Sequence, residues 1–141
     1  MKSQRGFTLT ETLVVVTVLA LLTAVSFPSF QNMLMRNKVR NTVDLISQAI
    51  YMGKSEALRR NVKIYIEVVG GDICIGTTSG GCELRREPVI NGVSVSTTQL
   101  VLSPFYGTPS PAPATFTASY SGISQSVTIN KLGMLTVGAM L

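Results

Sequence analysis

A single carboxylate, Glu11, stands at the entrance to a long apolar segment. Residues 12–35 contain no charged side chain, and the first half of this segment consists almost entirely of Leu, Val, Ala and Thr. A charge inside a membrane segment costs about 2.5–3.5 kcal/mol near the bilayer centre, and it usually has a function. We therefore expect Glu11 to do something that needs a carboxylate in apolar surroundings.

A partner for this carboxylate can come from the chain itself. Cleavage between Gly6 and Phe7 would give Phe7 a new α-amine, which is cationic at neutral pH. Glu11 lies four residues further on, so the amine and the carboxylate would share one face of a helix. Each could pair with the other or with the opposite group of a neighbouring subunit, which makes both charges tolerable in a low dielectric. The alternative is an ordinary secretory signal, because a short basic head (Lys2, Arg5) precedes the apolar segment.

The other reactive groups do not form a catalytic set. The chain has no His, which excludes Ser-His and Cys-His catalysis and removes the commonest metal ligand. Its two cysteines alone would make a poor zinc site. The remaining carboxylates have no spacing suited to acid–base catalysis; they are Asp44, Glu56, Glu67, Asp72, Glu83 and Glu87. We expect no enzyme activity, no cofactor and no metal.

The apolar segment predicts a membrane-spanning helix, because about 20 apolar residues cross a bilayer in helical form. Pro28 removes a backbone donor and predicts a kink. From residue 29 to about residue 60 the pattern is amphipathic. One stripe of residues at helical spacing is expected to pack against a β domain; it comprises Val39, Val43, Ile46, Ile50, Gly53 and Ala57.

After Asn61 the pattern changes to short β-strands. The expected strands are residues 62–69, 72–77 and 82–87, one or two within 93–103 with a break near Thr98, and 115–120, 125–130 and 134–137. Residues 104–113 hold four of the six prolines and predict a loop. The predicted fold class is α+β: a long N-terminal helix, transmembrane in its first half and amphipathic in its second, packed on a small antiparallel β-sheet domain.

The two cysteines fall on either side of a predicted turn. If the hairpin is centred on Thr78, Cys74 and Cys82 lie directly opposite each other and within disulfide reach. An even number of cysteines on the outer side of a membrane also favours a disulfide. The alternative is two buried free thiols.

Residues 6–11 (GFTLTE), followed by the apolar run and Pro28, resemble the class III signal of type IV pilins and pseudopilins. In that family a prepilin peptidase cuts after the Gly and methylates the new N-terminal Phe. The Glu then neutralises the N-terminus of an adjacent subunit. The resemblance implies cleavage between Gly6 and Phe7, N-methylation of Phe7 and an assembly role for Glu11. Thr10 is a mild departure, since Ile or Val often precedes the Glu.

Residues 53–61 (GKSEALRRN) narrow the resemblance to H-type minor pseudopilins and T/U-type minor pilins, the GspH/FimT type. This resemblance implies a leader peptide (1–6), a transmembrane and assembly helix (7–28) and a periplasmic pilin-like domain (29–141). The periplasmic domain is expected to be helical to about residue 60 and β-rich over 62–141. Basic residues flank the span on both sides, so charge alone leaves the topology open. The leader and the cysteine pair favour a single-pass protein of the bacterial inner membrane, later part of an extracellular or periplasmic filament.

The implied function is a minor pilin of a type IV pilus, serving assembly priming, adhesion, motility or DNA uptake. The alternatives are a minor pseudopilin of type II secretion and a DNA-binding minor pilin for transformation. The implied partners are other pilin or pseudopilin subunits, the prepilin peptidase and the inner membrane.

Some T-type minor pilins that bind DNA carry a Gly-Arg-x-Arg-like element near the C-terminus, but here Met134 occupies the position of an Arg in that element. Lys131, Arg85 and Arg86 are separated cations, which predict weak DNA binding at most.

Overall fold

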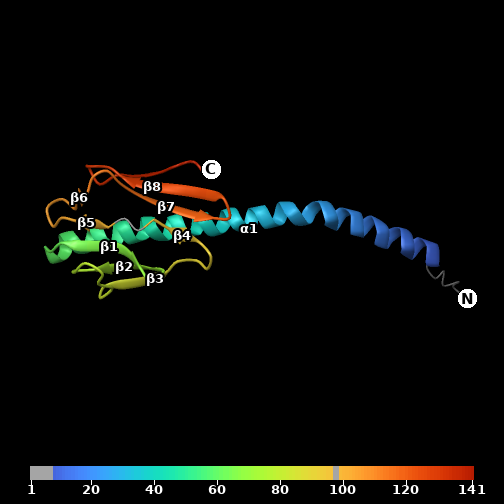
Figure 1. Ribbon diagram of the computed structural model, residues 1–141, viewed down its shortest axis with the longest axis horizontal. Helices are drawn as coiled ribbons and strands as arrows, with labels where there is room; N and C mark the ends of the chain where they lie inside the picture. The colour runs from blue at the N-terminus through green and yellow to red at the C-terminus, as the bar shows by residue number, and fades with distance from the viewer. Residues whose placement is uncertain (1–7, 97–98) are drawn as a thin grey trace, which may run out of the picture. The chain divides into compact units, whose positions relative to one another are not determined.

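The computed structural model describes residues 8–96 and 99–141. The chain divides into two compact units, residues 1–34 and residues 35–141. One helix, α1 (Leu9–Arg60), contributes to both units (Figure 1).

In the first unit, every described residue from Thr8 to Leu34 is solvent-exposed. Within the described part of the chain, α1 alone is long and apolar enough to cross a membrane, with a mean hydropathy of 2.3 over its most apolar window. The hydroxyls of Thr12 and Thr17 each donate to a carbonyl one turn earlier, at 2.8 Å. Because the helix itself satisfies these polar groups, they are compatible with a lipid environment. The helix continues through Pro28.

In the second unit, the predicted stripe of α1 faces the core. All six of its residues, from Val39 to Ala57, are buried, which confirms the prediction. The helix ends at Arg60, and Asn61 adopts the left-handed conformation (φ 55°) that commonly terminates a helix. Glu56 pairs with Arg59 at 2.6 Å and with Arg60 at 2.5 Å, which places both cations at the negative end of the helix.

The strands form two antiparallel sheets. The first sheet has the order β3-β2-β1-β5-β6 and the second has the order β4-β7-β8-β9. The strands of the first sheet are β1 (Ile64–Val69), β2 (Asp72–Gly76), β3 (Arg85–Pro88), β5 (Leu100–Leu102) and β6 (Pro109–Ser110). Those of the second are β4 (Ser94–Val95), β7 (Ala114–Tyr120), β8 (Ile123–Ile129) and β9 (Leu135–Val137).

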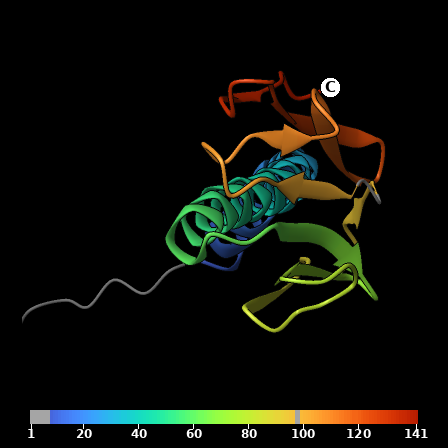
Figure 2. The ribbon, with the colours of Figure 1, turned by 90° about the vertical axis from the view of Figure 1, so that its left-hand side faces the viewer.

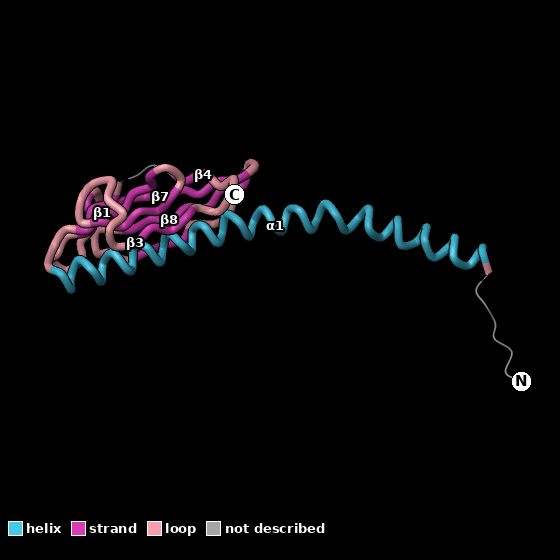
Figure 3. Tube along the Cα trace, turned by 90° about the horizontal axis from the view of Figure 1, so that it is seen from below, coloured by secondary structure: helices cyan, strands magenta, loops and turns pink. Residues whose placement is uncertain are grey.

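The core of the second unit lies between the second half of α1 and the two sheets. Figure 2, where the helix is seen end-on, and Figure 3 show the strands gathered along this half of α1. The packing is tight at Gly53, where an added Cβ would lie 2.8 Å from Ile66 Cδ1 and 3.1 Å from Leu102 Cδ1. Both of these side chains are fully buried. A glycine at this turn of the helix therefore allows β1 and β5 to pack against its backbone.

The structure corrects two details of the sequence prediction and decides a third, which is the number of strands within residues 93–103. Strand β3 begins at Arg85 and not at Cys82, and its register places Cys74 opposite Arg86. The predicted segment 93–103 does contain two strands, but they belong to different sheets. The predicted proline-rich loop includes the short strand β6, which pairs with β5.

Candidate assembly site

The N-terminal turn of α1 is capped by Thr8. Its hydroxyl accepts a hydrogen bond from the backbone N–H of Glu11 at 3.3 Å, and its carbonyl accepts from the N–H groups of Glu11 and Thr12 at 3.1 and 3.2 Å. A threonine at this position satisfies donors that the helix leaves free. Glu11 thus occupies the first turn, where the helix dipole favours a negative charge.

The surroundings of Glu11 are apolar and open. Leu9, Leu13 and Val15 are all more than half exposed. Among residues 8–96 and 99–141, no basic group forms an ion pair with Glu11. The other two predicted site residues, Gly6 and Phe7, lie outside the described residues. A carboxylate on an exposed apolar helix is suited to accept a cation brought by another chain.

The second predicted site, the disulfide, is present. Cys74 and Cys82 are bonded, with their Cα atoms 4.6 Å apart. Cys74 lies on β2 and is buried, whereas Cys82 lies in the loop before β3. The pairing was predicted, but its expected cause was wrong, because the two residues are not opposed in a ladder. The loop folds back and brings Cys82 to β2.

The Glu83 carboxylate holds this loop, since it accepts hydrogen bonds from the hydroxyls of Thr77 (3.0 Å) and Thr78 (3.1 Å). Its pKa lies below the ordinary value because its own backbone N–H, and then these hydroxyls, stabilise the charged form. A Cβ at Gly76 or Gly81 would lie 2.2 Å from Glu83 Oε2, so both glycines leave room for the carboxylate.

A second carboxylate ties the same loop to the first sheet. Glu67, on β1, accepts from Gln99 Nε2 at 2.5 Å and from Ser79 Oγ at 3.0 Å. The hydrogen bond from Gln99, followed by that from Ser79, holds the pKa of Glu67 below its ordinary value despite partial burial. The disulfide, Glu83 and Glu67 together fix the loop between β2 and β3.

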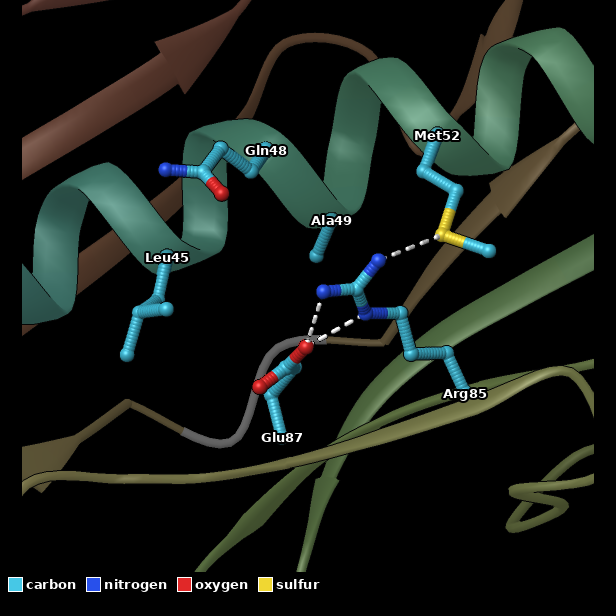
Figure 4. Close-up of a pocket in the computed structure, with 6 residues that line it drawn as sticks. All are labelled: Leu45, Gln48, Ala49, Met52, Arg85 and Glu87. Atoms are coloured by element: carbon cyan, nitrogen blue, oxygen red, sulfur yellow. Dashed lines mark hydrogen bonds and ion pairs between the residues drawn. The ribbon is translucent and has the colours of Figure 1, made fainter.

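The arginines considered for DNA contact are engaged with carboxylates. Arg85 pairs with Glu87 and reaches Met52 Sδ at 3.7 Å across a cavity of about 20 Å³ (Figure 4). That volume is enough for about one water molecule and not for a larger ligand. Arg86 lies 3.7 Å from Asp72. Adjacent strand residues point to opposite faces, so these two cations do not share a surface.

Lys131, the third of these cations, follows β8 of the second sheet, whereas the arginines lie on β3 of the first. The separation of these three cations gives no continuous basic surface. Sequence reasoning missed the cap at Thr8, although Thr8-x-x-Glu11 is the spacing of a capping box and was available as a signal.

Comparison with known proteins identifies the family. A family model of the prokaryotic N-terminal methylation motif matches residues 1–27, and a model of the type II transport protein GspH matches residues 42–133, more than half of the chain. The chain belongs to the GspH family. It is therefore a type IV pilin-like protein of the minor pilin and pseudopilin group, a group of structural subunits.

Two solved structures share the fold of this GspH-family chain. One crystal structure of the type IV minor pilin FimU of Pseudomonas aeruginosa (strain PAO1) matches with a TM-score of 0.63 and 19% identity, covering 74% of this chain and 90% of FimU. A second crystal form of FimU gives a TM-score of 0.60 and 17% identity, covering 71% and 92%. The long N-terminal helix packed on antiparallel sheets is thus a pilin-like fold.

Proposed function

We propose that this chain is a minor subunit of a type IV pilin-like filament, and that Glu11 is the residue through which it joins the filament. The observation that carries the proposal is the placement of Glu11 in the first turn of a helix whose described residues are exposed from Thr8 to Leu34. An exposed apolar helix of this kind needs lipid or other apolar helices around it. The match to the N-terminal methylation motif supports the same role.

Processing by a prepilin peptidase would create the partner of Glu11. Cleavage after Gly6 frees the amine of Phe7, which then receives a methyl group and stays cationic. In the filament core this amine meets the Glu11 carboxylate of an adjacent subunit. A buried pair of opposite charges is tolerated, whereas either charge alone is costly in an apolar bundle.

Before assembly the subunit is held in the bacterial inner membrane by residues 7–28. Residues 1–6 lie on the cytoplasmic side as the leader, and residues 29–141 form the periplasmic domain. The disulfide between Cys74 and Cys82 supports this topology, because such bonds persist in oxidising compartments.

The subunit could belong to either of two filament systems. The structural likeness to a type IV minor pilin favours a type IV pilus, whereas the family match to a type II transport protein favours a secretion pseudopilus. Deletion of the gene separates them: loss of surface pili with normal protein secretion indicates a pilus, and the reverse result indicates a secretion system. Direct DNA uptake is not favoured, because Arg85 and Arg86 are paired with carboxylates.

The assembly role is tested by Glu11→Gln, which removes the charge and keeps the shape. We expect the variant to be processed and to accumulate in the membrane, while its amount in sheared filaments falls at least tenfold. Asp44→Asn is the matched control, because Asp44 is an exposed carboxylate on the same helix outside the apolar segment. Normal incorporation of Glu11→Gln contradicts the proposal.

A further inference from the structure

Strand β9 lies at the end of the second sheet, and no strand in the described residues pairs with its outer side. The segment Met134–Gly138, here called the edge segment, pairs with β8 along its whole length in the register that places Thr136 opposite Thr128. The N–H of Asn130 donates to the carbonyl of Met134 at 3.0 Å, and the N–H of Gly138 donates to the carbonyl of Ser126 at 2.8 Å.

This register determines which backbone groups are free. In an antiparallel pair, every second residue directs its N–H and C=O toward the neighbouring strand. Met134, Thr136 and Gly138 are the residues that face β8. Leu135 and Val137 therefore direct their N–H and C=O groups outward, at the spacing that a further strand requires.

The other three sheet edges carry the features that prevent strand addition. Edge strand β3 has the sequence RREP, with three charged residues and a proline. Edge strands β4 and β6 have two residues each, and β6 contains a proline. Short, charged or proline-containing edges resist pairing with another chain.

The strand of the edge segment, β9, is also short, with three residues, but the segment lacks the charged residues and the proline of the other edges. Residues 132–141 contain neither a charged side chain nor a proline. Leu132, Met134 and Val137 are 76%, 57% and 50% exposed, so they present apolar surface beside the free backbone groups. Beyond Gly138 a β-bulge ends the regular edge. The four residues 138–141 lie opposite only three residues of β8, 124–126, so one residue has no counterpart in the pairing.

We propose that the edge segment is a docking site for an extended, uncharged strand of a neighbouring filament subunit, which adds to the second sheet beside β9. The proposal rests on the filament role given above. Outward backbone N–H and C=O groups select an extended strand as occupant, since strand addition uses these groups for affinity. A charged occupant would lose its hydration against Met134 and Val137, so the occupant must be uncharged at the positions that face them.

Two substitutions of Val137 test the docking of this strand. Val137→Pro removes an outward N–H and spares the hydrogen bonds to β8, because proline is tolerated where the N–H faces solvent. Val137→Lys keeps the N–H and adds a charge to the edge. We expect both variants to keep the thermal unfolding midpoint and the disulfide of the wild type, while incorporation into filaments falls about fivefold or more. Val69→Lys is the matched control, because Val69 is 40% exposed and lies on an interior strand.

Hydrogen exchange gives the direct readout. The amides of Leu135 and Val137, whose N–H groups face outward, should exchange at least tenfold more slowly in filaments than in the full-length subunit held in detergent, whereas the amides of Thr136 and Gly138 are already bonded to β8 in both states. Equal exchange in the two states, or wild-type incorporation of both Val137 variants, overturns the docking proposal. If Glu11→Gln abolishes incorporation while the Val137 variants do not change it, the filament role stands and only the docking site is rejected. Absence of the wild-type chain from filaments rejects the filament role itself.

Discussion

The hydroxyl of Thr8 accepts a hydrogen bond from the backbone N–H of Glu11 at 3.3 Å. Thr8 therefore caps the helix, and Glu11 sits in the turn where the helix dipole favours its carboxylate. Glu11 thus has a local role in the helix besides its proposed role between subunits. The two roles respond differently to substitution.

Thr8→Val removes the cap and leaves the carboxylate in place. The loss of one N-cap costs about 1 kcal/mol of local helix stability, so we expect filament incorporation to fall by no more than about fivefold. Glu11→Asp keeps the charge on a shorter side chain and should retain partial incorporation, whereas Glu11→Gln should retain almost none. Quantitative immunoblots of sheared filaments rank the variants. Equal defects in Thr8→Val and Glu11→Gln would show that capping, and not charge, is what assembly requires.

The disulfide should make a measurable contribution to the stability of the second unit. Replacing Cys74 and Cys82 together by Ala is expected to lower the free energy of unfolding by about 2–3 kcal/mol, the value for closing a short loop. Chemical denaturation of the full-length protein in detergent measures the change. Wild-type protein treated with a reductant serves as control and should unfold like the double variant; a difference below about 1 kcal/mol contradicts the prediction.

Gly53 is expected to tolerate no β-branched side chain. A Cβ there lies 2.8 Å from Ile66 Cδ1 and 3.1 Å from Leu102 Cδ1, both fully buried. Any gain in helix propensity over Gly is below about 1 kcal/mol, whereas overpacking a core costs about 1–3 kcal/mol. Gly53→Val should therefore lower the thermal unfolding midpoint. Ser55→Ala, on an exposed position two residues away, should leave the midpoint unchanged or raise it.

The loop between β2 and β3 should loosen in acid. Glu67 and Glu83 both have a pKa below the ordinary value, so each is a better proton acceptor in the unfolded chain than in the folded one. The two carboxylates therefore stabilise the folded loop fully above about pH 4.3, the ordinary pKa of a glutamate. This stabilisation is lost as the pH falls through the lower pKa values that the two groups have in the folded chain. Limited pepsin digestion between pH 5 and pH 2 should show increasing cleavage within residues 77–84. Glu83→Gln should be cleaved there already at pH 5, and a pH-independent pattern in the wild type opposes this account.

The helix could be predicted well from the sequence, because its signals are local. The spacing of Val39, Val43 and Ile46 fixed the buried face, and Asn61 marked the end. The strands near Ile64 and Ala114 were also expected from their β-branched and alternating patterns. These signals need only the residues of one element.

Register and sheet membership depended on contacts that the sequence does not display. The predicted hairpin centred on Thr78 assumed a tight turn. Instead, the hydroxyls of Thr77 and Thr78 donate to the Glu83 carboxylate, and the connection is a wider loop. Strand β3 therefore pairs with β2 in a register that places Arg86, and not Cys82, opposite Cys74. The division of β4 and β5 between two sheets is likewise set by their partners β7 and β1, which lie far away in the sequence.

The N-terminus of the mature chain tests the central claim most directly. Protein purified from the membrane should be analysed by intact mass and by N-terminal sequencing. The account predicts a chain that lacks residues 1–6 and begins at Phe7 with one added methyl group. A chain that keeps residues 1–6, or one that has lost the whole apolar segment as an ordinary secretory signal does, would contradict it.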